Sequence, residues 1–324
     1  MPQQRIKFIM MNPDTFRFYW ENTVACVSLL RLGVSPEDII VVQTAAGRIN
    51  YSQRLRNELG VQVYRFTDDR TTRQKNYIAS IKPYLWTKLL KHAPDMQQYD
   101  FFVQDSDIVF REIPNFNNTP ATANRWYGAD TESYTGVEYL NEKGPNFLKE
   151  IAPTLNMQPE DFWSYKGHGV GAQWFISHPT LEYWTDVFLE CVDLFYQTVS
   201  LEPAYKRRYA REGRPDFYFY QTWTAEMTAT LYNCHKHGIE PIITDEFNFD
   251  WSSSTKAETK NSHCKIIHNS GITKEDARKK HLFFKDDYVN KSPFDEDLSW
   301  VNPDYISSEY VQYIQYAKDW KKAR

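Results

Sequence analysis

The fold of this chain is decided by one stretch, Tyr99-Asp100-Phe101-Phe102-Val103-Gln104-Asp105-Ser106-Asp107-Ile108-Val109-Phe110. Its apolar run 101–103 predicts a buried strand, which the run 108–110 resumes after a polar interruption. Residues two apart in an extended segment point to the same side, so the Asp105 and Asp107 carboxylates leave the strand together. At the end of a strand in an open α/β sheet, where ligands bind, this pair suits a hard divalent cation such as Mg²⁺ or Mn²⁺.

An Asp-x-Asp triplet also occurs in ordinary solvated turns, so the triplet alone does not establish a metal site. Here aromatic and β-branched residues lie on both sides of the triplet, which is uncommon for a surface turn. The context therefore favours a metal site. Gln104 and Ser106, beside and between the two aspartates, are further candidates for contacts to a bound nucleotide.

Composition limits the class of protein. The chain has 324 residues and no linker rich in Gly, Ser or Pro, which indicates one large domain with a C-terminal extension; two domains are the alternative. A formal net charge of -4 gives no overall basic surface for nucleic acid, so a polyanion would need a local patch. The four cysteines form no CxxC pair, which predicts reduced thiols and not a zinc site or a disulfide framework.

The chain shows no sign of a membrane or secretory address. Residues 1–5 lead directly into a strand-like run, without the apolar core of a signal peptide. No apolar stretch approaches membrane-spanning length. We therefore expect the protein to be made and to work in the cytoplasm.

Strand and helix patterns alternate in the first part of the chain. Strands are predicted at 6–11, 38–44 and 62–66, with helices at 16–32 and 52–59. The alternation predicts an α/β fold with a mostly parallel sheet flanked by helices, whose ligands lie beyond the carboxyl ends of the strands. The segment 12–14 is predicted as a turn after the first strand. Polar residues expected at this edge of the sheet are Asn12, Gln43 and Thr44.

The phosphate-binding loops of two large enzyme classes are missing. No glycine-rich dinucleotide fingerprint follows the first strand, and no GxxxxGK[ST] loop occurs. Dinucleotide oxidoreductases and P-loop kinases are therefore disfavoured, whereas a nucleotide held by a metal through its phosphates needs neither loop. Lys82, near the start of a helix predicted at 79–92, could reach such a diphosphate, although a solvated lysine is the commoner outcome.

Two further polar candidates follow the triplet. Asp130 ends a strand predicted at 125–130 and could contact a polar ligand, with a simple turn acid as an equal alternative. His168 lies in the glycine-rich segment 167–176, where alternate glycines permit close approach of the backbone to a ligand. This histidine could bind a metal, but glycine-flanked loop histidines more often form local hydrogen bonds.

A buried acid is predicted on the helix at 217–237. Glu226 falls at helical spacing with Trp223, Met227 and Leu231 and so shares one face with them. A carboxylate on an apolar stripe is costly to bury unless it is paired or used. Glu226 is therefore the leading candidate for a catalytic or sugar-holding acid, with a rim glutamate as the alternative.

The densest basic cluster lies between that helix and another predicted at 179–198, and it is interleaved with Tyr205 and Tyr209. A solvated surface is the default interpretation. Cations beside stacking aromatics also suit a nucleic-acid strand, so the cluster is the candidate patch for an anionic acceptor. Its members are Lys206, Arg207, Arg208, Arg211 and Arg214.

Near the end of the chain, a short strand pattern runs into a tight loop, Cys264-Lys265-Ile266-Ile267-His268-Asn269-Ser270-Gly271-Ile272-Thr273-Lys274. His268 at the end of the strand could supply a nitrogen ligand. Gly271 permits close backbone approach, and Lys274 could neutralise phosphate. Together with the two aspartates, these residues predict a site for a metal and a diphosphate.

This combination resembles the metal and diphosphate site of GT-A-fold glycosyltransferases, particularly the glycogenin-like family 8 enzymes. The resemblance implies that Asp105, Asp107 and His268 are metal ligands and that the Gly271–Lys274 segment is the diphosphate loop. It also implies a Rossmann-type, GT-A-like mixed sheet and a UDP-sugar donor. Where the family usually has Pro-Trp after the lysine, this chain has Glu275-Asp276.

A second segment, Trp223-Thr224-Ala225-Glu226-Met227, resembles a Trp-x-x-Glu-Met segment of the hydroxyproline O-arabinosyltransferase-like enzymes. Both resemblances imply a catalytic domain over residues 1–275, with a nucleotide-sugar half at about 1–130 and an acceptor half at about 131–275. Residues 276–324 would then form a C-terminal extension packed on that domain.

The predicted function is metal-dependent transfer of a sugar from a nucleoside diphosphate sugar to an acceptor hydroxyl, with Mn²⁺ or Mg²⁺ as cofactor. The acceptor could be a modified DNA base, a glycan or a protein. An inverting reaction would need a carboxylate base, Glu226 or Asp130, whereas in a retaining reaction the leaving phosphate can take the proton. Rival interpretations are a metal-dependent nucleotidyl or phosphoryl transferase and a non-enzymatic module that binds carbohydrate or nucleic acid.

Overall fold

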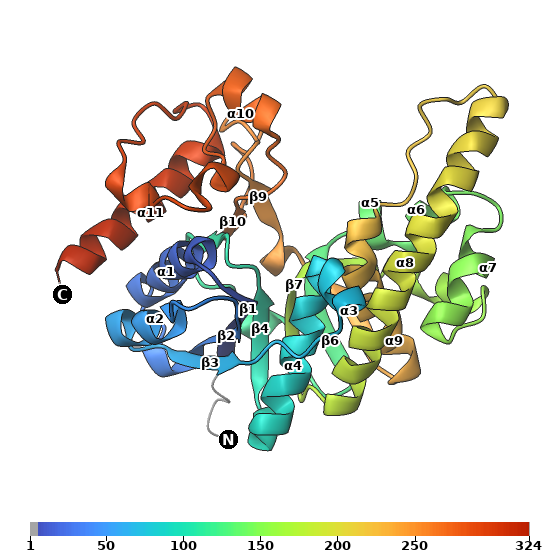
Figure 1. Cartoon of the computed structure of the whole chain (residues 1–324), viewed down its shortest axis with the longest axis horizontal. Helices are drawn as coiled ribbons and strands as arrows, with labels where there is room; N and C mark the ends of the chain where they lie inside the picture. Colours follow the sequence, from blue (N-terminus) through green and yellow to red (C-terminus); the bar gives the residue numbers. More distant parts are fainter. Residues whose placement is uncertain (1–5, 324) are drawn as a thin grey trace. The chain divides into compact units, whose positions relative to one another are not determined.

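The computed structural model describes residues 6–323 and divides into two compact units (Figure 1). The first unit combines the residues up to Asp68 with Phe101–Thr119 and the residues from Asp245 onward. The second unit combines Asp69–Asp100 with Pro120–Thr244. The polar lead at residues 1–5 lies outside the described residues. The division of the catalytic domain into donor and acceptor halves stays a prediction.

The first unit contains the strands and helices predicted from the first part of the sequence. Strand β1 (Ile6–Asp14) pairs in parallel with β2 (Ile39–Ala45), which pairs in parallel with β3 (Gln62–Phe66). The strand order is β3-β2-β1-β4, with β4 at Asp100–Gln104. Helix α1 (Phe16–Arg31) follows β1, and α2 (Tyr51–Leu59) follows β2. The alternating β-α-β-α-β pattern is confirmed.

The predicted turn at 12–14 is wrong, because these residues complete β1. Parallel pairing with β2 continues to Asp14, so the backbone of this segment is hydrogen-bonded as a strand. The Asp14 carboxylate also accepts hydrogen bonds from the backbone N–H of Ser52, at 3.0 Å, and from Nε of Arg65, at 2.6 Å. Helix α1 begins directly after this strand, at Phe16, with Thr15 as its N-cap residue.

A separate sheet of three strands carries the second half of the aromatic stretch. Its order is β5-β10-β9, where β5 is Ile108–Phe110, β10 is Ile266–His268 and β9 is Phe249–Trp251. Strand β10 pairs antiparallel with β5 and parallel with β9. The prediction that 108–110 resumes the strand at 101–103 is wrong, because the chain changes sheets at the Asp-Ser-Asp triplet.

Aromatic packing inside the first unit explains why this stretch is so rich in phenylalanine. The Phe102 ring on β4 lies 5.8 Å from the Phe110 ring on β5 and 5.1 Å from the Phe247 ring. Phe8 on β1 lies 5.8 Å from Phe102 and packs edge-on against Phe110. Ring pairs at these distances bury a large apolar area, so they hold β4 and β5 firmly on either side of the triplet.

The last part of the chain belongs to the first unit and packs against its helix α1 and strand β5. Helix α10 covers Lys274–Lys280, and α11 (Ile306–Lys322) packs against α1. The Trp20 indole of α1 donates a hydrogen bond to the backbone carbonyl of Tyr288 at 2.9 Å. The Tyr313 hydroxyl of α11 donates one to the carbonyl of Phe110 at 2.9 Å. These long-range bonds fix the end of the chain against β5 and α1.

The second unit has three more strands of the α/β sheet. Strand β6 (Arg125–Asp130) pairs antiparallel with β7 (Val170–Ser177) and parallel with β8 (Glu240–Ile243), in the order β7-β6-β8. With the four strands of the first unit, the sheet has seven strands that are mostly parallel and are flanked by helices. The predicted α/β fold class is confirmed.

Two long helices of the second unit differ from their predicted bounds. Helix α8 runs over Leu181–Arg211 and passes through Pro203, so it is longer than the predicted 179–198. It continues because Tyr205 and Tyr209, four residues apart, bury their rings on one face. Helix α9 covers only Ala225–Lys236, and α4 (Ile81–His92), α8 and α9 pack together (Figure 1). The short helices of this unit are α3 (Thr72–Asn76), α5 (Glu132–Thr135), α6 (Val137–Asn141) and α7 (Phe147–Ile151).

Between residues 6 and 323, no helix combines the length and the apolar character that crossing a membrane requires.

Candidate metal centre

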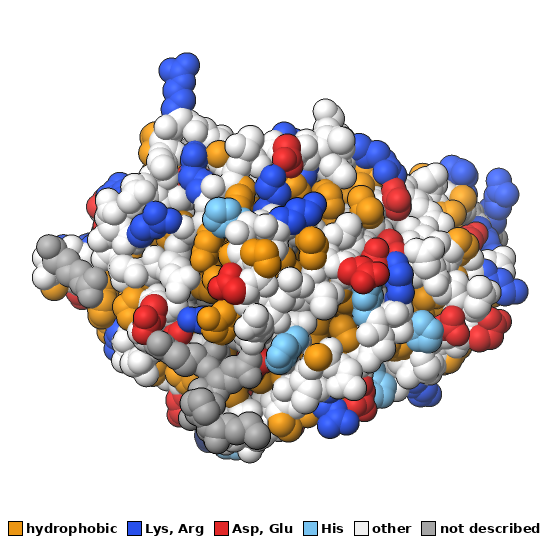
Figure 2. All heavy atoms as spheres, turned by 90° about the horizontal axis from the view of Figure 1, so that it is seen from below, with side chains coloured by type: hydrophobic (Ala, Val, Ile, Leu, Met, Phe, Trp, Pro, Cys, Tyr) orange, Lys and Arg blue, Asp and Glu red, His pale blue; other side chains and the backbone are white. Residues whose placement is uncertain are grey.

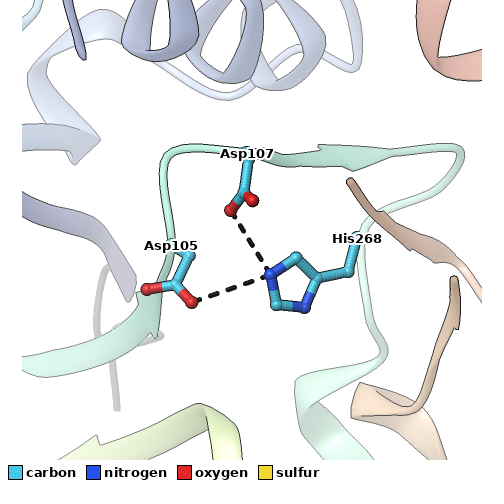
Figure 3. Close-up of side chains that lie close together, drawn as sticks. All are labelled: Asp105, Asp107 and His268. Carbon is cyan, nitrogen blue, oxygen red and sulfur yellow. Dashed lines mark ion pairs between the residues drawn. The ribbon is translucent and has the colours of Figure 1, made fainter. Parts of the chain in front are cut away.

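Two aspartates and one histidine meet in the first unit, although 161 positions separate Asp107 from His268. One ligand atom from each of Asp105, Asp107 and His268 lies within 4.8 Å of the others. Nε2 of His268 is 3.3 Å from Oδ1 of Asp107 and 3.7 Å from Oδ2 of Asp105 (Figure 3). Two carboxylates and an imidazole are a donor set that Mn²⁺ and Mg²⁺ accept, so the residues fit such a cation.

Strand pairing brings the three side chains together. Asp105 and Asp107 lie in the turn between β4 and β5, and His268 is the last residue of β10. Antiparallel pairing sets His268 opposite Ile108, the residue after Asp107. The backbone N–H of Asn269 donates a hydrogen bond to the Asp107 carbonyl at 2.9 Å, which ties the triplet to the end of β10. The predicted cluster therefore depends on one strand register.

The imidazole of His268 is held by aromatic rings. Trp251 of β9 stacks on it at 5.3 Å with an interplanar angle of 16°, and Phe249 packs edge-on at 5.1 Å. The His268 side chain is buried, and its Nε2 faces the aspartates. A ring that is fixed in this way loses little conformational entropy when it binds a ligand.

The two oxygens of Asp107 face different partners. Oδ1 faces His268, whereas Oδ2 forms an ion pair with the ammonium group of Lys285. Burial alone would raise the pKa of the Asp107 carboxyl, but the charges of Lys285 and His268 hold it well below its usual range. The same ion pair raises the pKa of Lys285 against the opposing effect of its burial. Asp107 is therefore firmly anionic.

A buried glutamate supports the triplet from helix α1. The Ser106 hydroxyl donates a hydrogen bond to Oε2 of Glu21 at 2.7 Å, and Nε of Arg17 donates to Oε1 at 2.8 Å. Burial and the nearby charge of Asp107 raise the pKa of Glu21, although Lys285 and Arg17 oppose that shift. The Ser106 hydroxyl is therefore directed toward Glu21. Its predicted contact with a nucleotide stays a prediction.

Sequence reasoning missed Glu21 and Lys285. A signal for Glu21 was present, because it stands in an apolar helix between Trp20 and Val24, and the cost of burying a carboxylate applies there as it did to Glu226. No sequence signal marks Lys285, which follows a short apolar run in a polar segment. Only the tertiary structure brings it to Asp107.

The predicted edge residues of the sheet form a buried hydrogen-bonded group. Nδ2 of Asn12 donates to Oδ1 of Asn22 at 2.9 Å, and Nε2 of Gln43 donates to Oδ1 of Asn12 at 2.8 Å. The Ser52 hydroxyl donates to Oε1 of Gln43 at 2.8 Å. Thr44 is buried beside them at the end of β2. Their contact with a nucleotide stays a prediction.

The diphosphate-loop candidates lie after β10. Gly271 has a φ of +72°, a left-handed conformation that favours glycine. A Cβ atom added at this position would lie in ordinary contact with the Trp251 ring, at 3.5 Å. Lys274 is exposed and begins helix α10. It lines an open pocket of about 440 Å³ together with Arg278 and His281. Gln104, at the end of β4, has a buried amide without a hydrogen-bond partner among residues 6–323.

Four candidates lie in the second unit. Glu226 is buried, with 8% of its surface exposed, and its backbone N–H donates to the Tyr77 hydroxyl at 2.7 Å. Asp130 ends β6 and accepts a hydrogen bond from the backbone of the following helix. Nδ1 of His168 lies 2.7 Å from the Pro241 carbonyl, which agrees with the alternative that this histidine forms a hydrogen bond and does not bind a metal. Lys82 is half-buried in the first turn of α4.

The expected helical face around Glu226 is wrong in one respect. Trp223 precedes α9 and is 59% exposed, so it does not share a helical face with Glu226. The first turn of α9 begins only at Ala225, because the preceding residues form a separate short 3₁₀ turn at Thr222–Thr224. Leu231 is fully buried on α9, in agreement with the prediction.

The basic cluster is largely a helix end with local partners. Its first four members end α8, and Arg214 follows. Lys206 pairs with Glu202 at 2.7 Å and Arg208 with Glu212 at 3.0 Å. Tyr205 and Tyr209 are buried, and the Tyr209 ring stacks on Phe217 at 3.8 Å. These buried rings offer no exposed surface for the stacking of bases, and binding of nucleic acid by the basic cluster stays a prediction. On the face drawn in Figure 2, basic and acidic side chains are interspersed.

No model of a protein family matches the chain, and no curated protein sequence matches it. Solved structures with a similar arrangement include the apo structure of the bifunctional glycosyltransferase WbbM, with a TM-score of 0.47 and 12% sequence identity. That match covers 96% of this chain but 50% of WbbM, so the chain spans about half of its length. Apo mouse xyloside xylosyltransferase 1 matches with a TM-score of 0.37 and 11% identity over 83% of this chain and 99% of that protein.

Proposed function

We propose that this chain is a metal-dependent glycosyltransferase that moves a sugar from a nucleoside diphosphate sugar to an acceptor hydroxyl. The observation that carries the proposal is the meeting of Asp105, Asp107 and His268 within 4.8 Å, after a buried strand of an α/β sheet. The resemblance of the same residues to a GT-A metal site supports it. So does the resemblance of the loop from Gly271 to Lys274 to a diphosphate loop.

The chemistry of the donor set fits a metal-diphosphate. Asp105 and Asp107 offer carboxylate oxygens, and His268 offers Nε2. Three protein ligands leave coordination positions for phosphate oxygens, as hard divalent cations prefer. A divalent cation held there would stabilise the negative charge that develops on a departing diphosphate. A UDP-sugar is the donor to test first, because it is the donor of the glycogenin-like enzymes that the motifs resemble.

The proton acceptor is the second part of the proposal. If the reaction inverts the configuration, Glu226 is the first candidate base, because its carboxylate is buried on α9 and a buried carboxylate is retained only where it is paired or used. Asp130 is the second candidate. Product configuration, determined by NMR once an acceptor is known, separates this role from a retaining reaction that needs no protein base.

One experiment tests the proposed function against its two rivals. Purified protein is incubated with Mn²⁺ and a panel of nucleotide-sugars, without an acceptor, and the products are separated by chromatography. Release of a nucleoside diphosphate supports glycosyl transfer, whereas release of a sugar 1-phosphate together with a nucleoside monophosphate would indicate a nucleotidyl transferase. A binding module would release neither. EDTA and the Asp105→Asn variant serve as controls for metal dependence.

A further inference from the structure

Lys285 is a charged neighbour of the candidate metal centre that belongs to none of its motifs. It lies 178 positions after Asp107, at the start of a short 3₁₀ helix (Lys285–Tyr288). Its ammonium group pairs with Oδ2 of Asp107, while Oδ1 of the same carboxylate faces Nε2 of His268 at 3.3 Å. Oδ1 of Asp107 thus faces the candidate metal position beside His268, while the charge on Oδ2 is neutralised by Lys285.

The other charged groups around the Lys285–Asp107 ion pair have partners of their own. Arg17 forms an ion pair with the buried Glu21 at 2.8 Å and with Asp286 at 2.7 Å. The side chain of Asp286 is 49% exposed, so water screens its charge. Asp105 and Asp107 therefore present two negative charges to a cation, and Lys285 cancels one of them.

We propose that Lys285 is a positioning residue that makes metal binding depend on the diphosphate of the donor. By neutralising one oxygen of Asp107, it weakens the attraction of the site for a bare divalent cation. A cation accompanied by the negative charges of a diphosphate does not meet this penalty. By linkage, the metal and the nucleotide then raise each other's affinity. The inference rests on the proposed function and identifies how the same site selects the metal-diphosphate.

A purely structural ion pair predicts the opposite sign. If Lys285 only held Asp107 in place, its removal would leave a misplaced carboxylate, and Mn²⁺ would bind more weakly. If Lys285 weakens the attraction of the aspartates, its removal strengthens Mn²⁺ binding. The direction of the change therefore distinguishes the two roles.

The test is a binding cycle on the full chain. Mn²⁺ affinity is measured by electron paramagnetic resonance of free Mn²⁺, with and without UDP, for the wild type and for Lys285→Met, which keeps the apolar stem. We expect the variant to bind Mn²⁺ alone roughly tenfold more tightly or better. UDP should improve its Mn²⁺ affinity by a smaller factor than in the wild type. Lys285→Gln, which can still donate a hydrogen bond to Asp107, should show the same change if the methionine variant folds poorly.

Two controls and the contrary outcomes complete the design. Lys285→Arg should retain the wild-type cycle, and so should Lys279→Met, whose lysine is 70% exposed and pairs with Glu275. Equal or weaker binding of Mn²⁺ by both neutral variants, or an unchanged effect of UDP, would overturn the inference. If hydrolysis of the nucleotide-sugar still requires Mn²⁺ in that case, the proposed function stands. If no protein binds Mn²⁺ under any condition, the inference and the metal centre fail together.

Discussion

The candidate metal centre and the basic cluster at the end of α8 are both dense in charged side chains, but they are assembled differently. In the metal centre, Asp107 meets His268 and Lys285 from positions more than 160 residues away. In the basic cluster, Lys206 and Arg208 pair with glutamates four residues away, on helix α8 and at its C-cap. The first grouping requires the fold, whereas the second requires only the helix.

The difference has an energetic meaning. Exposed ion pairs at helical spacing contribute only about 0.3–0.5 kcal/mol each, so such a cluster forms at little cost and signals little. Gathering buried carboxylates costs several kcal/mol unless partners compensate them. Charged groups that a fold collects in a buried place are therefore better evidence of a site than charged groups that follow one another in sequence.

The largest effect is expected at Asp107. Asp107→Asn removes one charged ligand and should lower Mn²⁺-dependent donor hydrolysis at least about a thousandfold, the equivalent of roughly 4 kcal/mol. Hydrolysis is measured by release of nucleoside diphosphate, and circular dichroism checks that the fold survives. Full activity in the folded variant would end the metal-centre interpretation and with it the contrast between the two regions.

The second effect concerns His268, the candidate ligand from the last part of the chain. His268→Ala should weaken Mn²⁺ binding at least about tenfold in the presence of UDP, because one of three protein ligands is lost. Isothermal titration calorimetry gives the affinity. His263→Ala, an exposed histidine before the same strand, is the matched control and should have no effect. Equal affinities of both variants would make His268 a core residue only.

The third effect concerns Tyr313, a buried residue of α11 that supports strand β5 next to the candidate metal centre. Burial raises the pKa of Tyr313 from 10.0 to about 12, and its hydroxyl donates a hydrogen bond to the Phe110 carbonyl of β5. A pKa that is higher in the folded state stabilises the fold fully below pH 10, and this stabilisation is lost as the pH rises toward 12. Tyr313→Phe should therefore lose about 1 kcal/mol near neutral pH and show a smaller deficit as the pH rises through that window.

Urea unfolding of the wild type and Tyr313→Phe at about pH 7, 10 and 11 measures this change. Tyr316→Phe is the matched control, because Tyr316 lies on the same helix but 37% of its surface is exposed. A deficit of Tyr313→Phe that does not shrink with rising pH would contradict the prediction.

The smallest effect is expected in the basic cluster. Reversal of charge at Arg207 and Arg208 should lower the free energy of unfolding by less than about 1 kcal/mol and leave donor hydrolysis unchanged, because these side chains lie on an exposed helix end. Reversal at Lys279 and Lys280 is the matched control.

The same variants test the proposal of an anionic acceptor. If the cluster contacts DNA phosphates, the double reversal should reduce the log-log salt slope of DNA binding by close to two units, whereas the control reversal should not. An unchanged slope would remove nucleic acid as a partner of this segment and would leave neutral hydroxyl compounds as acceptors.

Local patterns allowed much of this molecule to be predicted. Apolar runs of strand length separated by amphipathic helices identified β1, β2 and β3 to within a few residues, because the side-chain period of an element is a property of its own sequence. The spacing of Asp105 and Asp107 and the strand pattern before His268 likewise indicate metal ligands. The course of α8 through Pro203 was missed, because the tyrosines that favour it pack against distant aromatic rings.

Local side-chain patterns specify the type and order of most strands and helices, and they indicate three candidate metal ligands. Long-range packing sets three other features: the change of sheets at the triplet, the pairing of His268 with Ile108, and the contacts of Lys285 and Glu21 with the triplet. The physical reason is that strand order and register depend on which apolar faces bury each other across the whole chain. Partners that are brought together by register leave no periodic trace in the sequence.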